Sequence, residues 1–499
     1  MGEEGGGRSC GTTRDLQKLK QQAMEYYREN DVPRRLEELL NSTFYLQPAD
    51  VYGHLANCFS KLAKPPTICK VVGKNVLDGL GLPTLQVEIF CTVQNFPKNI
   101  CSVVISTHFE VHENALPELV EAEELERSDA VSTAVQWVNE TITEELQGLA
   151  PSNQAEVDQV LRTFFESKVQ EDKERKELEK SLEDSTVPTP SPLTPPLPPP
   201  PPAKKKGQKQ GRKDTLTEKP IVPPEPVEPI LCGSMAIGAV SLAVAKTSAV
   251  LGNNPLYLNI ALLKHHQDQP AKLTIPLLMV SLVSCGKSSP GKLNLMKEVI
   301  CIPHPGLTAK QGVDMLLEIQ KHINKTIEMD SEQWDSTYNA LGSKCYIIAG
   351  TASKSISKLL EDGNIGILRC SGLIVKHTNQ TTMSDLVEMT NLIDSKKHIA
   401  VFGSAEGESS DDSLVDLAVG LGVRFIKLGG LSRGERVTKY NRLFTIEEEL
   451  VQNGTLGFSE EHTFFYLNEE AEKAAMAGEL PEPPEPIFAT EVVEQSAKT

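Results

Sequence analysis

The sequence predicts an α/β protein in which parallel strand–helix units form a barrel or an open sheet. From Leu273 onward, short apolar runs typical of buried strands alternate with amphipathic stretches of helical spacing, which is the pattern of a parallel βα architecture. The chain has 499 residues, of which 39% are hydrophobic and 24% are charged. That length corresponds to roughly two to four domains with a sizeable core.

The composition excludes several classes of protein. Asp and Glu number 68 against 50 Lys and Arg, giving a net charge of −18, so we expect no nucleic-acid partner that is held by overall positive charge. The longest apolar runs, such as Ala236–Ala245, reach only about half of a membrane span. The N-terminus has no apolar signal region, and the ten cysteines lack metal-ligand spacing. We therefore expect a cytoplasmic protein with reduced thiols and no membrane partner.

Residues 1–14 are glycine-rich and are predicted to be disordered, and residues 15–66 are predicted to form a helical hairpin. Pro33 and Pro48 each suit the first turn of a helix. Each helix carries one apolar stripe, and the stripe residues are Leu36, Leu39, Leu40, Val51, Leu55 and Phe59. Two helices of about a dozen residues cannot bury both stripes alone, so self-association into a four-helix bundle is expected.

The following 67–169 region mixes two predicted strands, Leu85–Thr92 and Cys101–Thr107, with a predicted amphipathic helix over Ala130–Leu149. Residues 170–229 begin with a charge-dense run and hold 15 of the 33 prolines, so they are interpreted as a disordered insertion. Its lysine cluster suits a nuclear-import or polyanion patch, and its proline run suits an SH3 or WW ligand. A solvated spacer is favoured over both.

After the insertion, Gly233–Val250 is predicted to be a tightly packed helix of small residues, and residues 471–499 form an acidic tail predicted to be disordered. The predicted strands are Leu277–Val283, Val299–Ile302, Cys345–Ala349, Gly372–Val375, Ile399–Phe402 and Phe425–Lys427. The predicted helices between and after them are Gln311–Ile323, Ser353–Glu361, Met383–Asp394, Ser413–Gly420 and Arg433–Asn453. Chemistry in such a fold is expected at the carboxyl ends of the strands.

Two resemblances add to this pattern. The Val-Pro-x-x-Leu-x-x-Leu-Leu run from Val32 and the Pro-x-Asp-Val-Tyr run from Pro48 resemble the docking-and-dimerisation hairpin of protein kinase A regulatory subunits and the related Dpy-30 module. That resemblance implies a homodimer that offers a groove to an amphipathic anchoring helix. The alternative is a hairpin that packs onto its own protein.

The second resemblance is to enolase. The segment VRFIKLGGLSRGERVTKYNRLFTIEEELVQNG at 423–454 resembles the last barrel units of that family. Shorter matches lie at 77–90, 233–257, 293–303 and 372–380. The resemblance implies an enolase-like fold, with an α+β N-terminal domain (67–169 plus 230–272) followed by a shortened βα, TIM-type barrel (273–470). The overall plan is similar to the divergent enolase of sperm flagella.

The family reaction is the Mg²⁺-dependent dehydration of 2-phosphoglycerate to phosphoenolpyruvate in glycolysis. By resemblance, Lys376 is the catalytic base, Lys427 holds the substrate carboxylate, and Glu298 acts on the hydroxyl side. The superfamily pairs a Lys or His base with one or two Mg²⁺ ions, which three acidic residues hold. A lysine at the end of a strand is more often a surface residue, and Glu298 alone suits an ordinary salt bridge.

The sequence departs from the family at several of these points. Gly350 and Thr351 stand where the family has an acidic pair, and Ser404-Ala405-Glu406 replaces its His-Arg-Ser phosphate clamp. Glu298 and Lys376 are 78 positions apart, where the family has roughly a hundred residues more, or about three βα units.

The three family metal ligands are therefore not found, and the candidate substitutes among the local acids are Glu328, Asp330 and Glu332. We expect either an incomplete barrel or a shortened form of a longer protein, with weak or lost activity. The alternative function is that of a dimeric scaffold in a motile cilium or sperm flagellum.

Overall fold

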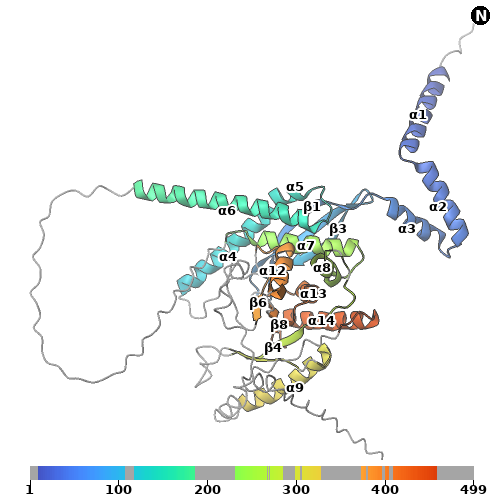
Figure 1. The fold of residues 1–499 in the computed structure, drawn as a ribbon. Helices are drawn as coiled ribbons and strands as arrows, with labels where there is room; N and C mark the ends of the chain where they lie inside the picture. The colour runs from blue at the N-terminus through green and yellow to red at the C-terminus, as the bar shows by residue number, and fades with distance from the viewer. Residues whose placement is uncertain are drawn as a thin grey trace, which may run out of the picture. The chain divides into compact units, whose positions relative to one another are not determined.

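The structure is a computed structural model, and the residues that it describes fall into several ranges. They are residues 9–106, 117–185, 231–266, 268, 270–284, 298–303, 306–327, 372–377, 380–395, 399–403 and 408–457. Their contacts divide them into two compact units: residues up to 67 together with 91–98, and residues 68–90 together with those from 99 onward (Figure 1).

The first unit contains the helices α1 (Ser9–Glu29), α2 (Val32–Leu46) and α3 (Val51–Leu62). Pro33 lies in the first turn of α2, as predicted. The prediction for Pro48 was wrong, because the carboxylate of Asp50 caps α3 by accepting the backbone N–H of Gly53 at 2.8 Å.

Helix α1 also overturns part of the disorder predicted for residues 1–14. It begins at Ser9, well inside that segment, because the glycine-rich composition ends at Gly7 and the residues after it continue into the helical spacing of the next two turns.

A three-stranded meander follows, most of which belongs to the second unit. Its strands are β1 (Thr67–Leu77), β2 (Pro83–Val93) and β3 (Phe96–Val104). The helix predicted over Ala130–Leu149 is divided into α4 (Pro117–Trp137), a π-helical turn (Val138–Ile142) and α5 (Thr143–Leu146). Asn139 in the π turn exchanges two hydrogen bonds with the backbone of Gly73 in β1, at 2.9 and 3.1 Å. The side chain thus fixes this turn against the sheet.

Helix α6 (Gln154–Ser185) corrects the predicted start of the disordered insertion. Residues 170–185 are helical because oppositely charged side chains lie three or four positions apart, which supports a solvated helix. Examples are Lys168 with Glu171 at 2.8 Å and Lys176 with Asp172 at 2.6 Å. Residues 186–230 and the acidic tail lie outside the described residues.

Helix α7 (Met235–Leu251) is buried along almost its whole length, as its small side chains predicted, and α8 (Leu256–Lys264) follows it at a bend of 108°. In the described ranges, no single helix is long and apolar enough to cross a membrane, although α7 and α8 together have the necessary length and composition.

The central sheet has five strands in the order β5-β4-β8-β7-β6. The strands are β4 (Leu277–Ser284), β5 (Glu298–Cys301), β6 (Gly372–Val375), β7 (Ile399–Gly403) and β8 (Phe425–Gly429). All five were predicted, and β6, β7, β8 and β4 pair in parallel as expected. Strand β5 is antiparallel to β4, so the parallel pairing expected for this strand was wrong.

The described helices of this half are α9 (Ala309–Ile327), α12 (Met383–Ser395), α13 (Ser413–Gly420) and α14 (Gly434–Gln452). Each matches a predicted helix to within a few residues. The strand predicted over Cys345–Ala349 and the helix predicted over Ser353–Glu361 lie outside the described residues.

Both faces of the sheet are buried. One face carries an apolar cluster that consists of Leu277, Met279, Val401 and Phe425, with Ile300, Ile302, Ile374 and Ile399 packed against it. Residues between these along the strands point to the other face, where Phe402 and Ile426 are fully buried. Helices α12 and α14 pack against β7 and β8 (Figure 1). A parallel sheet covered on both sides is the arrangement expected for a βα fold.

The close contact between α13 and α8 allows the packing of the helices to be tested. A Cβ atom on Gly420 would lie 2.5 Å from the carbonyl oxygen of Tyr257 and 2.6 Å from Cβ of Ile260. We expect Gly420→Ala to lower the free energy of unfolding by about 1–3 kcal/mol through overpacking, as measured by urea denaturation. Gly434→Ala is the matched control, because nothing lies within 4 Å of that position. Equal stability of the two variants would contradict the described packing.

Candidate functional site

Three strand ends form one row at the carboxyl edge of the parallel sheet. Gly403 at the end of β7 is the register partner of Lys427 in β8. Lys376 follows directly after β6, and its Cγ and Cε atoms lie 3.9 Å from the place that a Cβ on Gly403 would occupy. Since register partners in parallel strands face the same side, the two lysines flank a glycine, with their backbones roughly 10 Å apart.

The row rests on the apolar cluster of the sheet. Ile374, Val401 and Phe425 each lie two residues before a member of the row on the same strand, so they face the same side. The lysine stems therefore lie above an apolar layer, in which Cγ2 of Ile374 comes within 3.1 Å of the place that a Cβ on Gly403 would occupy. Two ammonium groups placed this way suit a small molecule that carries more than one negative charge.

Glu298 lies at the same end of the sheet. It is the first residue of β5 and pairs with Ser284, the last residue of β4. Because β5 is antiparallel to β4, its beginning coincides with the carboxyl ends of the other strands. The backbone of all three predicted site residues is thus at one edge, with Glu298 on the strand farthest from Lys376.

The residues described at this edge do not fit Mg²⁺. That ion requires carboxylate oxygens in octahedral geometry. The row presents two amines and a glycine, and the carboxylate of Glu298 stands on the strand farthest from Lys376. The carboxylate that follows β7, Glu408, is buried and engaged by Lys439 and Arg436. Within the described ranges, no three His, Cys, Asp or Glu side chains gather where they could hold a metal. Most of the other positions discussed above, namely 328–332, 350–351 and 404–406, lie outside those ranges.

The ion cluster around Glu408 was missed by the sequence analysis. Nζ of Lys439 donates to Oε2 of Glu408 at 2.9 Å and to two backbone carbonyls, and Nε of Arg436 donates to Oε1 at 3.3 Å. Lys439 is fully buried and lies four residues before Leu443 on the apolar stripe of α14. The position of Lys439 on the apolar stripe could have indicated the ion cluster from the sequence, because a charged side chain on a buried helix face needs a buried partner.

The same helix also holds the loop that follows β8. The hydroxyl of Tyr440 donates to the carbonyl of Gly429 at 3.1 Å, and burial raises the pKa of that hydroxyl. Gly429 has a φ of 78°, and a Cβ there would lie 2.8 Å from the guanidinium carbon of Arg436. Glycine suits this position because a φ of 78° lies in the left-handed region, where any other side chain is strained.

The loop after Lys376 is held from both sides. Nε2 of His377 lies 3.1 Å from the carbonyl oxygen of Thr381, and the ring also hydrogen-bonds the backbone of Gly238 in α7. Burial lowers the pKa of His377 to about 4, so the ring is neutral at pH 7. These contacts fix the backbone next to Lys376.

At the other end of this loop, a buried carboxylate holds the start of α12. Asp158 in α6 accepts the backbone N–H of Ser384 at 2.9 Å, its hydroxyl at 2.6 Å, and the hydroxyl of Ser241 at 2.6 Å. Burial raises the pKa of Asp158, and hydrogen bonds from both serines lower it. Helices α6, α7 and α12 are thereby joined through one side chain.

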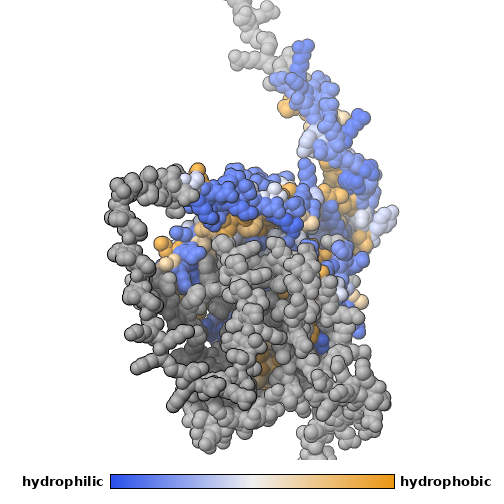
Figure 2. Space-filling model, turned by 60° about the vertical axis from the view of Figure 1, so that its left-hand side comes forward, coloured by the Kyte–Doolittle hydropathy of each residue, from blue (hydrophilic) through white to orange (hydrophobic). Residues whose placement is uncertain are grey.

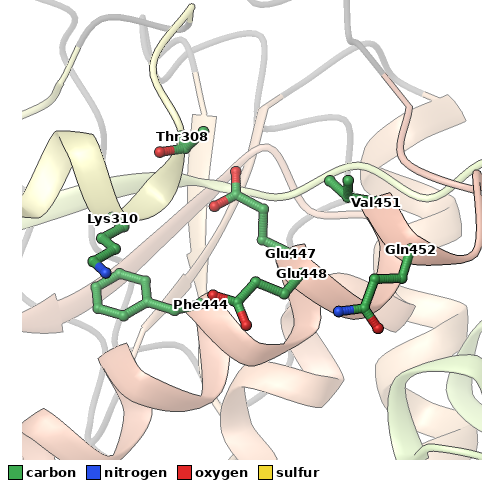
Figure 3. A pocket seen from close by; sticks show the side chains of 7 residues that line it. All are labelled: Thr308, Lys310, Phe444, Glu447, Glu448, Val451 and Gln452. Atoms are coloured by element: carbon green, nitrogen blue, oxygen red, sulfur yellow. The ribbon is translucent and has the colours of Figure 1, made fainter.

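A separate pocket of about 250 Å³ lies between the start of α9 and α14 (Figure 3). Its wall includes Thr308, Lys310, Phe444 and Glu447. The carboxylate of Glu447 accepts the backbone N–H of Ala309 at 2.9 Å, and burial raises its pKa. This carboxylate caps α9, and the pocket contains neither lysine of the row.

A mostly parallel sheet that packs against helices, with lysines at the carboxyl ends of its strands, is typical of the βα class of proteins. The model of the enolase C-terminal TIM barrel domain matches residues 319–463. "Enolase 4" of Homo sapiens is 68% identical over 620 positions, which cover 100% of this chain and 99% of that protein. The chain is also similar to "Enolase 4" of Danio rerio, at 31% identity with 89% and 93% covered. The chain belongs to the enolase family.

The alignment with the human relative also bears on the length of the barrel. The alignment has 620 positions, 121 more than the 499 residues of this chain. Some residues of the relative therefore have no counterpart in this chain. The shortfall agrees in size with the span that the sequence analysis expects to be missing between Glu298 and Lys376.

The ion cluster gives a prediction for stability. Lys439→Met removes the cation that lies 2.9 Å from the buried Glu408 carboxylate, closer than Arg436 at 3.3 Å. We expect a loss of about 3 kcal/mol in the free energy of unfolding, because a buried charge loses its partner. Arg433→Met is the control, since its 4.0 Å pair with Glu435 is exposed on the arginine side and is worth at most about 1 kcal/mol. A Lys439→Met variant as stable as the control would rule out this role.

Proposed function

We propose that this chain is an enolase-family protein that binds 2-phosphoglycerate or a similar anion at the lysine row, with weak or lost turnover. The observation that carries the proposal is the row itself: Lys376 and Lys427 face one side of the sheet across Gly403. In this assignment Lys376 is the base, Lys427 holds the substrate carboxylate, and Glu298 acts on the hydroxyl side.

The weak turnover is argued from electrostatics. Removal of a proton next to a carboxylate creates a dianion, which needs positive charge in addition to a base. Losing one preorganised donor costs a factor of about 10²–10³ in rate. Here the metal ligands are not found, and Glu406 stands in the segment that replaces the phosphate clamp, where its charge repels phosphate. These losses act together on the same transition state.

Turnover and binding of 2-phosphoglycerate by the full-length chain test this proposal. With Mg²⁺ present, we expect a kcat at least about 10³ below the enzyme median of about 10 s⁻¹. Binding of 2-phosphoglycerate, measured by calorimetry, should weaken at least about tenfold in Lys427→Ala, because a fixed positive charge is lost. The exposed Lys70→Ala in β1 is the control. Ordinary Mg²⁺-dependent turnover that Lys376→Ala abolishes would contradict lost activity.

A second function, that of a dimeric scaffold, is favoured by the first unit. Leu36, Leu40 and Phe44 follow one another at helical spacing along α2 and are 40%, 57% and 70% exposed. Figure 2 shows such hydrophobic side chains among hydrophilic ones on the N-terminal helices. Apolar side chains repeated along one helix face favour association, since burying each contributes about 1.5–3 kcal/mol.

In this second function, two copies pair through α2 and α3 and offer a groove to an amphipathic anchoring helix. The resemblance of this hairpin to docking-and-dimerisation modules supports the arrangement. We propose a cytoplasmic site of action, in a motile cilium or sperm flagellum, where an enolase-like body is held by its anchoring partner.

Light scattering of the full-length chain tests the dimer. We expect a mass near twice the 54.6 kDa of one chain, and a monomer for Leu40→Asp, because a charge in the apolar stripe opposes its burial. Asn41→Asp introduces the same charge at the neighbouring exposed position and should leave the dimer intact. A monomeric parent chain at micromolar concentration would exclude this assembly.

A further inference from the structure

Helix α3 carries a histidine–cysteine pair that the proposed functions do not use. His54 and Cys58 are four residues apart, and Nε2 of the histidine lies 3.6 Å from Sγ of the cysteine. Both residues are half-buried. Neighbouring positions on one helix face are therefore occupied by two of the side chains that transition metals prefer.

The separation of the two atoms fits a tetrahedral metal. Zinc binds a thiolate at about 2.3 Å and an imidazole nitrogen at about 2.0–2.1 Å, so the edge between two such ligands is about 3.5–3.6 Å. Ligands four residues apart on a helix are a known half-site for zinc. The same distance also suits a hydrogen bond between the thiol and the imidazole. Titration with a metal distinguishes the hydrogen bond from a metal site.

The pair lies within the apolar face of α3. Leu55 and Leu62 are three residues before and four residues after Cys58, so they flank the thiol on the same face. Leu62 is half-exposed, so this face has apolar surface to bury. A two-fold dimer places residues near its axis against their own copies, and the pair would thereby meet a second pair.

Such a dimer completes a ligand set that the described residues of one copy leave incomplete. Within the described ranges, no third His, Cys, Asp or Glu joins the pair to form a metal-holding group. A structural zinc site needs four protein ligands, and Cys₂His₂ is one of the common sets. Two copies of His54 and Cys58 supply that set.

We propose that a Zn²⁺ ion bridges two copies of this chain through His54 and Cys58 of each α3 helix. The inference rests on the proposed dimer and adds a metal to it. Each thiol gives up its proton when the metal–sulfur bond forms, so two protons leave for each zinc bound. The two thiolates balance the charge of Zn²⁺, which leaves a neutral site within an apolar interface.

Titration of the chelator-treated, full-length chain with Zn²⁺ alone tests the proposal. Calorimetry should give one zinc for two chains and about two protons released per zinc, read from the buffer dependence of the heat. Cobalt in place of zinc should show a thiolate-to-metal charge-transfer band. Cys58→Ser and His54→Gln should each lose at least about a hundredfold in affinity, whereas Cys69→Ser, a half-buried cysteine in β1, should retain it.

The oligomeric state separates the outcomes. If the dissociation constant of the dimer rises at least tenfold in the presence of chelator, and equally in Cys58→Ser, the bridging metal is supported. A dimer that binds no zinc overturns this inference and leaves the scaffold proposal standing. Zinc bound one to one by a monomeric chain overturns both the bridge and the dimer.

Discussion

The parallel register of β6, β7 and β8 is the constraint on which the rest of the structure depends. It places Lys376, Gly403 and Lys427 in one row although they are far apart along the chain. Because both faces of the sheet are buried, a shift of one residue in any strand would move its lysine and its apolar cluster residue together to the opposite face and disrupt the packing on both. The site is therefore fixed by hydrophobic packing, and its chemistry by the few residues at the strand ends.

Buried polar groups then hold the loops that leave this edge. Glu408, with Lys439 and Arg436, ties the segment after β7 to α14, and Asp158 ties the start of α12 to α6 and α7. Each carboxylate is engaged by its own donors, so the helices around the sheet are joined through interactions that tolerate little change. This frame is shared by both proposed functions, since an enolase-like body needs it whether or not it turns over substrate.

The N-terminal helices have the opposite character. Most of their large apolar residues remain exposed in a single copy, whereas the second unit has a buried apolar core. We propose that association covers this surface, and the His54–Cys58 pair gives the proposed association a chemical form that measurement can separate from apolar contact alone. Catalysis and assembly are therefore assigned to different parts of the chain.

The sequence by itself determined the family, the described strands of the sheet and the lysines at its edge, because strand–helix periodicity and local motifs are written in neighbouring residues. The sequence-based predictions were wrong about the start of the helix after Pro48, which the Asp50 cap sets. They were also wrong about disorder in residues 9–14 and 170–185, which are helical. Only the tertiary structure showed the antiparallel β5, the Glu408 cluster and the anchoring of His377. These depend on contacts between residues distant in the chain, such as Glu408 with Lys439, and no local pattern specifies which buried charge meets which partner.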